Sequence, residues 1–501
     1  MVRPLRPMRY WKTKLYPSFS SALNFKEFWN AGLHDGVVFL NEAAAIIGKF
    51  NKSVLSDLPV DLNNTNKYLV VLKDSYQAGD GKFLDNGWMM ELPHPVSKIT
   101  WDNYAAISHT TAKELGVDTN DKIKIQIGNK TLEMPAFIQP GAADKTITIE
   151  IGFGRTVVGV VGEDVGFNII PLMSKNGGVS PWIYNATSVS KGNGSYKLAS
   201  SVEHHVFAGA VAKNILARRG IVYEGTVNEY RKNPHFIMVA TKEKKVDQIY
   251  PSNKEFYKGV KWGMAIDLNK CLGCEECVIA CISENNVPIV GKEQVEDTRI
   301  MHWIRIDKYY SGSFDEPIIS TQPMLCQQCD DAPCENVCPV AATTHSPDGL
   351  NQQIYNRCIG TRYCENNCPY MVRRFNFFNF RDHFKDAYQQ SNLLSLVYNP
   401  QVTIRSRGVM EKCTFCIQRI MEARSDAIRE DRPLKGSDVK TACQVACNTD
   451  AIKFGDMNDK GAEFVQYRNN KLGYYVLKSL NVMPNVTYLA KLRNTYTEEE
   501  S

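Results

Sequence analysis

Short runs in which apolar and polar residues alternate predict β-strands in the first half of the chain. The clearest runs contain Ile123, Ile125 and Ile127, then Ile147, Ile149 and Ile151. A period of two is typical of a strand with one buried face. Gly128 and Asn129 are suited to a hairpin turn between strands, and Pro140 with Gly141 to another. We therefore expect a β-barrel over residues 66–173.

Other patterns complete this outline. Residues 110–116 predict one short helix, with Thr110 as its cap and Gly116 at its end. Residues 1–65 read as a partly helical lead-in, with the clearest helix at residues 41–47. The glycines at residues 152–162 favour barrel corners over a nucleotide loop, because they do not form the G-x-G-x-x-G pattern.

The remaining boundaries follow from composition. Residues 174–260 are rich in loop-forming residues and predict a linker that wraps the protein. It contains the pair His204 and His205, which we assign to ordinary structure because no cysteine or third histidine is near in sequence. A cysteine-rich domain over residues 261–455 and a tail over residues 456–501 complete the chain.

The length and the net charge limit the classes of protein to which the chain can belong. A chain of 501 residues predicts two or three domains. The formal charge of +5 is mild, without a basic run that would indicate nucleic acid. No stretch approaches the roughly 18 apolar residues of a membrane span. The start of the sequence lacks the pattern of a secretory or twin-arginine signal.

The chemistry lies in the cysteines. All fifteen fall between Cys271 and Cys447. They form four groups: Cys271, Cys274, Cys277 and Cys281; Cys326, Cys329, Cys334 and Cys338; Cys358, Cys364 and Cys368; Cys413, Cys416, Cys443 and Cys447. The first group is the C-x2-C-x2-C-x3-C run of bacterial ferredoxins. The second and third end in Cys-Pro.

In ferredoxins with two clusters, three cysteines of a run bind one cluster and the fourth binds the other. Such groups work in pairs, so the first pairs with the fourth and the second with the third. The predicted iron sites are site A (Cys271, Cys274, Cys277, Cys447), site B (Cys413, Cys416, Cys443, Cys281), site C (Cys326, Cys329, Cys334, Cys368) and site D (Cys338, Cys358, Cys364). Sites A, B and C are predicted to hold [4Fe–4S] clusters.

Site D is one thiolate short, because Thr361 stands where a fourth cysteine is expected. A threonine hydroxyl is a poor iron ligand near neutral pH, so we expect a [3Fe–4S] cluster there. The alternative is a [4Fe–4S] cluster with Thr361 or water on its fourth iron. Structural zinc and disulfides also use cysteine pairs. Tight runs of three or four cysteines disfavour zinc, and an odd total disfavours disulfides.

The segments around the cysteines resemble a known family. They are Trp262-Gly-Met-Ala-Ile-Asp267, His302-Trp-Ile-Arg-Ile306, Cys358-Ile-Gly-Thr-Arg-Tyr-Cys364, Arg373-Arg-Phe-Asn-Phe377 and Gly408-Val-Met-Glu-Lys-Cys413. They are similar to the iron–sulfur subunit of bacterial alternative complex III, a membrane quinol oxidoreductase. Residues 85–88, 92–95 and 100–103 resemble the last, barrel-forming domain of its molybdopterin-oxidoreductase-like half.

The resemblance implies an α+β architecture in which that barrel, without molybdopterin, precedes a ferredoxin-like domain of two paired double-cluster modules. It implies an electron-transfer subunit without a substrate site of its own. Its partners would be an integral membrane quinol-binding subunit, multihaem cytochrome c subunits and a terminal oxidase, and its location the periplasmic side of the bacterial inner membrane. Site D would receive the electrons.

Two departures from the family concern the length and the fourth motif. Family chains are about twice as long, so the missing amino-terminal half is expected to be a separate chain or this sequence a carboxy-terminal portion. The fourth motif continues with Asn448 where the family has proline; the expected effect is small.

Arg357, Arg362, Arg373 and Arg374 lie near site D in sequence. They predict either a raised potential for that site or ordinary pairs with acidic residues at the surface. Two other functions stay open: the electron-transfer subunit of a molybdenum-dependent polysulfide or dimethyl sulfoxide reductase, and a structural remnant without clusters. The nearly complete ligand sets disfavour the remnant.

Overall fold

The computed structural model describes residues 11–18, 24–36, 68–173, 178–180, 182–202, 221–237, 257–380 and 397–494. The chain divides into two compact units, Met1–Asp61 and Leu62–Ser501. In the first unit, α2 (Phe25–Asp35) begins at a capping box between Asn24 and Glu27 and ends at the left-handed Gly36. The short turns η1 (Trp11–Leu15) and η2 (Tyr16–Ser18) precede it. The helix expected at residues 41–47 lies outside the described residues.

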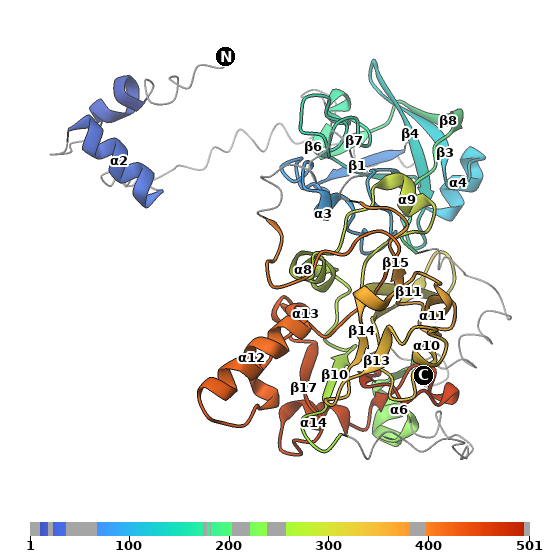
Figure 1. Cartoon of the computed structure of the whole chain (residues 1–501). Helices are drawn as coiled ribbons and strands as arrows, with labels where there is room; N and C mark the ends of the chain where they lie inside the picture. Colours follow the sequence, from blue (N-terminus) through green and yellow to red (C-terminus); the bar gives the residue numbers. More distant parts are fainter. Residues whose placement is uncertain are drawn as a thin grey trace. The chain divides into compact units, whose positions relative to one another are not determined.

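The second unit begins with an eight-stranded sheet in the order β6-β7-β1-β5-β2-β4-β3-β8 (Figure 1). The strands are β1 (Leu69–Lys73), β2 (Ala105–Ile107), β3 (Asp121–Ile127), β4 (Lys130–Ile138), β5 (Thr146–Glu150), β6 (Gly178–Ser180), β7 (Ile183–Asn185) and β8 (Ser188–Ser195). Strand β1 pairs in parallel with β5, and β2 with β4. The remaining pairs within this sheet are antiparallel.

The alternating isoleucines form the core of this sheet, as predicted. Ile123, Ile125, Ile147 and Ile149 are fully buried in one aliphatic cluster. The hairpin at Gly128 and Asn129 is confirmed, because Ile127 pairs with Lys130 across it. Closure of the sheet into a barrel stays a prediction.

Three helical segments accompany the sheet: α3 (Gly87–Met90), α4 (His109–Leu115) and η4 (Ile170–Leu172). The helix predicted at residues 110–116 is α4, and Gly116 ends it with φ 64°. Its cap is Ser108 rather than Thr110, because the Ser108 hydroxyl accepts the Thr111 N–H. Two residues of sequence thus separate the observed cap from the expected one.

The segment predicted as a linker contributes strands instead of a plain loop. Strand β8, which contains the glycine-rich residues 191–194, pairs with β3. A Cβ on Gly192 would lie 3.0 Å from the Lys122 carbonyl oxygen, so glycine permits this close approach. Further on, β9 (Glu224–Thr226) pairs with β20 (Lys491–Arg493) at the other end of the chain, and α6 (Val227–Lys232) follows. His204 and His205 lie outside the described residues.

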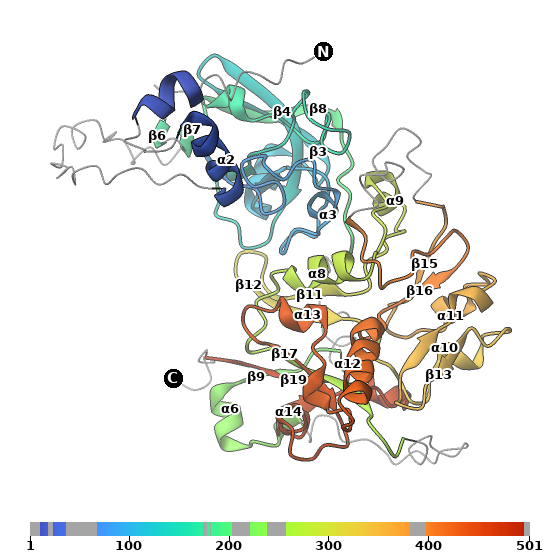
Figure 2. The ribbon, with the colours of Figure 1, turned by 60° about the vertical axis from the view of Figure 1, so that its left-hand side comes forward.

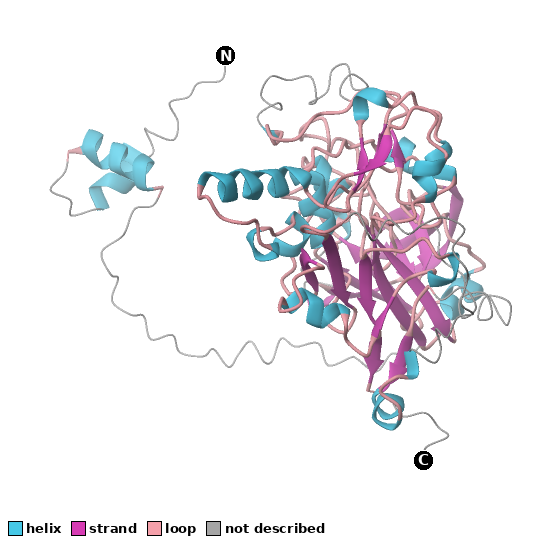
Figure 3. Ribbon diagram, turned by 60° about the horizontal axis from the view of Figure 1, so that its bottom comes forward, coloured by secondary structure: helices cyan, strands magenta, loops and turns pink. Residues whose placement is uncertain are grey.

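The cysteine-rich region is built on a second, four-stranded sheet (Figure 3). Its order is β17 (Ile452–Asp456), β10 (Trp262–Asp267), β19 (Val486–Leu489) and β18 (Gly473–Tyr474). Strand β19 lies parallel to β10, so the carboxy-terminal segment packs back into this region. Three two-stranded pairs join it: β11 (Arg305–Gly312) with β12 (Pro317–Met324), β13 (Thr343–His345) with β14 (Asn351–Gln353), and β15 (Arg374–Phe375) with β16 (Met410–Glu411).

Short helices and the longer α12 flank these strands (Figure 2). They are α8 (Glu276–Glu284), α9 (Lys292–Glu296), α10 (Pro333–Asn336), η6 (Tyr355–Arg357), α11 (Tyr363–Asn366), α12 (Ile417–Arg429), η8 (Gly436–Asp438), α13 (Ala442–Val445), α14 (Glu463–Arg468) and η9 (Lys478–Leu480). Helix α8 packs against α13, and α10 against α11. No helix among the described residues is long and apolar enough to cross a membrane.

Candidate iron–sulfur sites

In the first three cysteine groups a bent loop leads into a helix, whereas the loop of Cys413 and Cys416 leads into the long helix α12 and Cys443 lies on α13. The helices α8, α10, α11 and α13 contain Cys277, Cys334, Cys364 and Cys443 respectively. Each loop also contains a residue with a positive φ: Gly273, Gln328, Gly360 and Phe415. A left-handed residue reverses the chain locally. At Gly360 the requirement is strict, since a Cβ there would lie 2.5 Å from the Gly408 carbonyl oxygen.

The first and fourth groups meet, as the spacing predicts. The Cys271 thiol has Cys447 and Cys274 as its electrostatic neighbours, and the Cys277 thiol interacts with Cys271 and Cys274. In site B, Cys281 has Cys413, Cys416 and Cys443 as neighbours. The structure therefore brings each predicted set, A and B, together.

The second and third groups also meet. The Cys329 thiol has Cys326, Cys368 and Cys334 as electrostatic neighbours, which are the other members of site C. The Cys364 thiol has Cys358 and Cys338, the other members of site D. Thr361 is exposed on the loop of site D.

The four sites also follow one another in space. Sites A and B approach through Cys277 and Cys443, and sites B and C through Cys413 and Cys326. Between sites C and D lies the guanidinium of Arg373, which interacts with Cys334 and Cys364. The order is therefore A, B, C, D.

Burial and crowding control the protonation of these thiols. Burial raises the pKa of Cys277, Cys281, Cys329 and Cys413 well above the usual value, and the neighbouring thiols raise it further. Thiolates are the form that binds metal. A positively charged partner is needed to hold so many thiolates in one interior, and iron supplies that charge.

The structure also bears on the alternatives of disulfides and zinc. All fifteen cysteines are free, so none forms a disulfide. Among the described residues, no group of three or more His, Cys, Asp or Glu side chains is placed to hold a single metal ion. Around one zinc ion each sulfur lies about 2.3 Å from the metal. In an iron–sulfur cluster each thiolate binds a different iron, so its sulfurs need not converge on one atom.

Comparison with known proteins agrees with these donor sets. No family model matches the chain. The iron–sulfur cluster-binding subunit of menaquinone reductase from Nitratidesulfovibrio vulgaris is 36% identical over 260 residues, which cover 98% of that protein and 50% of this chain. The chain belongs to the iron–sulfur subunit family of such reductases. Its other half lies outside this match.

Two further relatives agree with this assignment. The Hdr-like menaquinol oxidoreductase iron–sulfur subunit 1 of Archaeoglobus fulgidus is 33% identical over 266 residues, covering 88% of that protein and 49% of this chain. The B subunit of polysulfide reductase from Wolinella succinogenes is 28% identical over 227 residues, covering 92% and 45%. The iron–sulfur subunit family therefore includes quinone-linked and sulfur-linked members.

Backbone N–H groups point at several sulfurs of this iron–sulfur subunit. The Ala342 N–H donates to Cys338 Sγ over 3.2 Å, and the Met410 N–H to Cys358 Sγ over 3.4 Å. Burial raises the pKa of Cys338, but N–H groups of residues 340–343 outweigh it, and the net pKa is lowered. Such donors stabilise negative charge on sulfur and raise the potential of a bound cluster.

The four arginines near site D differ from one another. Arg357 and Arg362 are exposed, and Arg362 lies over the Phe375 and Phe377 rings. Arg374 is partly buried and its Nε donates to the His302 carbonyl oxygen. Within the described part of the chain, none of the four forms an ion pair. Arg373 is fully buried, so the alternative of a surface pair is wrong for it.

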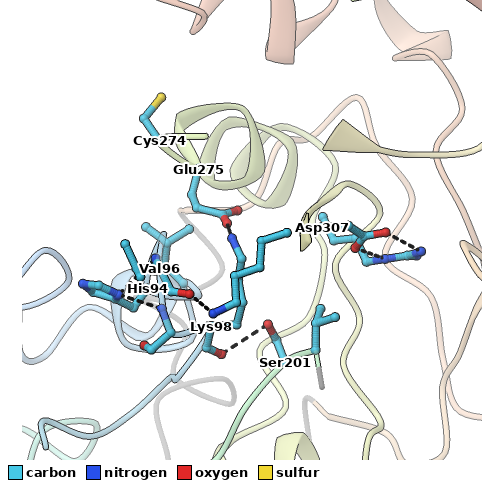
Figure 4. A network of polar contacts seen from close by, with 12 residues as sticks. His94, Val96, Lys98, Ser201, Cys274, Glu275 and Asp307 are labelled. Atoms are coloured by element: carbon cyan, nitrogen blue, oxygen red, sulfur yellow. Dashed lines mark hydrogen bonds and ion pairs between the residues drawn. The ribbon is translucent and has the colours of Figure 1, made fainter. Parts of the chain in front are cut away.

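The sheet region reaches directly into the loop of site A (Figure 4). The Tyr76 hydroxyl donates to the Cys274 carbonyl oxygen. Lys98 Nζ lies 2.5 Å from a carboxylate oxygen of Glu275, and both side chains are only 1% exposed. Burial raises the pKa of Glu275 to about 7, although Lys98 opposes it. Site A is thus covered by residues that are more than 170 positions away in sequence.

The sequence did not single out these covering residues. Glu275 stands inside the first cysteine motif, which was a usable signal, but nothing in the sequence marks Lys98 as its partner. Asn448, the departure in the fourth motif, donates from Nδ2 to Glu276 over 3.0 Å and so links the fourth motif to the first.

Proposed function

We propose that this chain is the electron-transfer subunit of a membrane-bound quinol oxidoreductase of the alternative complex III type. It would relay single electrons from quinol oxidation towards haem subunits or an oxidase. Three sites would hold [4Fe–4S] clusters through four cysteines each, and site D a [3Fe–4S] cluster through Cys338, Cys358 and Cys364. The observation that supports the proposal is the chain of electrostatic contacts that links the four cysteine sets in the order A, B, C and D.

The chemistry itself belongs to the bound groups: an iron–sulfur cluster gains or loses one electron with little rearrangement. The residues of the chain supply the rest. Nine of the fifteen cysteines are buried, which excludes water from the route. The N–H donors at Cys338 and Cys358 favour negative charge at site D. A site with a raised potential is suited to accept electrons from a quinol.

Site D also has the surface for a partner. Two large apolar side chains next to its ligands are exposed, Ile359 by 65% and Tyr363 by 57%. Arg357 and Arg362 add exposed positive charge on the same loops. We assign this surface to the integral membrane quinol-binding subunit, with multihaem cytochrome c subunits further along. The resemblance to alternative complex III supports a position on the periplasmic side of the membrane, where the partners would hold the chain.

The fold proposal follows the same family. Residues 68–202 would correspond to the barrel domain of molybdopterin oxidoreductases without the cofactor, and residues 257–494 to a ferredoxin-like domain with two double-cluster modules. Tyr76 and Lys98, which cover the site A loop, give the first region a role beside the relay.

A second candidate is the electron-transfer subunit of a molybdenum-dependent reductase. It is favoured by the similarity to the polysulfide reductase B subunit and to a putative dimethyl sulfoxide reductase iron–sulfur subunit of Halobacterium salinarum, 31% identical over 241 residues. Molybdenum in the purified complex, at one atom per chain, would favour this candidate over the first.

The first experiment is to measure iron and labile sulfide on the anaerobically purified chain, together with its paramagnetic resonance spectrum after oxidation. The proposal expects about 15 irons per chain and a three-iron signal. Iron near zero, or zinc in its place, would contradict the relay.

The Thr361→Cys variant tests the cluster type at site D. A fourth thiolate should convert the site to [4Fe–4S], remove the three-iron signal and lower the potential, and quinol oxidation should slow. An unchanged potential with an unchanged signal would show that Thr361 does not determine the cluster.

A further inference from the structure

Arg373 lies between two of the sites, and no acidic side chain of the described residues forms an ion pair with it. Its side chain is 1% exposed. Nη2 donates to the Thr343 hydroxyl over 2.9 Å and to the Gln353 amide oxygen. Both partners are neutral. Nε and Nη1 have no hydrogen-bond partner within the described part of the chain. A buried guanidinium with unused donors is costly unless a negative group lies near it.

The strands β13 and β14 hold the side chain of Arg373 in position. Thr343 in β13 is the register partner of Gln353 in β14, and the Thr343 hydroxyl donates to the Gln353 amide oxygen over 3.0 Å. Residues on either side belong to the two sites: Cys338 precedes β13, and the Cys334 thiol donates to Asn351 of β14 over 3.7 Å. The hairpin therefore holds the charge at one place relative to both sites.

The negative groups nearest to Arg373 are the cysteines. Burial alone would lower the pKa of Arg373, but Cys334 and Cys364, followed by Cys326 and Cys368, raise it. Cys364 belongs to site D and the other three to site C. Geometry agrees with this placement, because Thr343 follows Ala342, whose N–H donates to Cys338 Sγ of site D, and Gln353 lies two residues from Asn351, which contacts Cys334 of site C.

A second buried arginine makes a useful contrast. Arg405 lies close to Cys281 of site B, but its Nη2 is 2.8 Å from a carboxylate oxygen of Glu411, and both side chains are fully buried. Its charge is therefore balanced within the protein. Among the described residues, no carboxylate lies at such a distance from Arg373. Its positive charge therefore acts on the electrostatic potential at sites C and D.

We propose that Arg373 is a shared positioning residue that raises the midpoint potentials of sites C and D together. This inference rests on the proposed relay. When either site accepts an electron from its donor, the added negative charge lies beside the same guanidinium. The guanidinium therefore favours the reduced form of each site. An electron on the route then has its lowest energy at site C or site D. A surface charge would be screened by water and would act on one site at most.

The test is a redox titration of the full chain with its clusters, followed by paramagnetic resonance at each site. In the Arg373→Gln variant the ratio of reduced to oxidised form, at a fixed ambient potential, should fall about tenfold at both site C and site D, which corresponds to about 59 mV for one electron. Sites A and B should stay within twofold. Arg429→Gln, at an exposed residue of α12 that pairs with Asp426, is the control and should change neither C nor D by more than twofold.

A second variant keeps the arginine and removes only its excess charge. Gln353→Glu places a carboxylate on the atom that already accepts from Nη2, with almost no change in shape. It should lower both potentials in the same direction as Arg373→Gln, and it carries the test if Arg373→Gln fails to bind iron. Lysine at position 373 should restore much of the loss.

The outcomes separate this inference from the relay itself. Full iron content with unchanged potentials at C and D in both variants would overturn the role of Arg373 and leave the relay intact. A shift at one site only would overturn the sharing. Absence of iron from the unmodified chain would overturn the relay first.

Discussion

The sheet region, residues 68–202, and the cysteine-rich region, residues 257–494, have interiors made of different kinds of side chain. The first packs Ile123, Ile125, Ile147 and Ile149 in an aliphatic cluster without a cysteine. The second has nine buried cysteines, several of them inside its main hydrophobic cluster. An aliphatic core is stable by removal from water alone. A core of crowded thiols depends on what binds them, so the two regions should respond differently to the same treatment.

Removal of iron should have the largest effect and should act on one region. Metal binding free energy is folding free energy where the site does not exist in the unfolded chain. After anaerobic chelation, amide exchange in β10 and β17 should become fast while β3 and β5 stay protected. Equal loss of protection in both regions would contradict the distinction.

Lys98→Met should have the next largest effect on stability, because it removes the contact of Lys98 with Glu275 between the sheet region and the cysteine-rich region. It removes the partner that lowers the pKa of the buried Glu275, so the carboxyl group should take up a proton near neutral pH, and the loss of the contact should cost about 1–3 kcal/mol. The measurement is the free energy of unfolding in denaturant. The double variant with Glu275→Gln should recover most of the loss. Lys191→Met breaks an exposed pair with Asp121 and serves as the control, with an expected change below about 1 kcal/mol.

The titration of Glu91 should have a smaller effect, which is a change in the free energy of unfolding with pH. Burial raises the pKa of Glu91 from 4.5 to about 8, although the N–H groups of Gly291 and Val290 favour its charged form. The folded state therefore holds a proton that the unfolded state releases between these values. Stability from this group is full below about pH 4.5 and falls as the pH rises towards 8, by at most about 1.4 kcal/mol per unit. Glu91→Gln should flatten this slope, and an equally steep slope in the variant would assign it to another group.

Asn448→Ala should have the smallest effect. It removes one hydrogen bond from an exposed side chain to Glu276, so the free energy of unfolding should change by about 0.5 kcal/mol or less. Iron content should be the same as in the unmodified chain. A loss of iron from site A would show that this link between the first and fourth motifs holds the ligand Cys447 in place.

The two regions also differ in how much of them the sequence predicted. Spacing in the cysteine motifs predicted four ligand sets, and the electrostatic neighbours of the thiols agree with them, but the sets themselves stay a prediction. Alternation at Ile123 and Ile147 predicted strands and their buried face. Sequence alone did not predict the strand β8, since its glycines are typical of loops and only the approach to Lys122 explains them. Asn24 and Glu27, which form a capping box, and Gly36, which ends the helix, mark α2 in the sequence. The predicted helix was instead assigned to residues 41–47.

The polar contacts across the molecule could not be predicted at all. Lys98 finds Glu275 from 177 positions away, and Arg373 is buried where the sequence allowed an exposed position. Both depend on how whole regions pack, which no short pattern contains. Burial of a charged group is a property of its neighbours in space, whereas the sequence records only its neighbours along the chain.

The meeting of Cys271 with Cys447 has a consequence for the topology of the chain. These are the first and last cysteines, so a filled site A ties together the two ends of nearly the whole cysteine-rich region. Such a tie restricts the unfolded chain as a cross-link does, and for a loop of more than 100 residues the entropy removed is worth about 5 kcal/mol. Site B joins Cys281 to Cys443 in the same way, so Cys447→Ala alone should change the resistance to denaturant little, and the double variant with Cys281→Ala should lose most of this stabilisation. Cys281 and Cys447, one from each of these two motifs, would thus limit the freedom of the chain between the first and fourth cysteine groups.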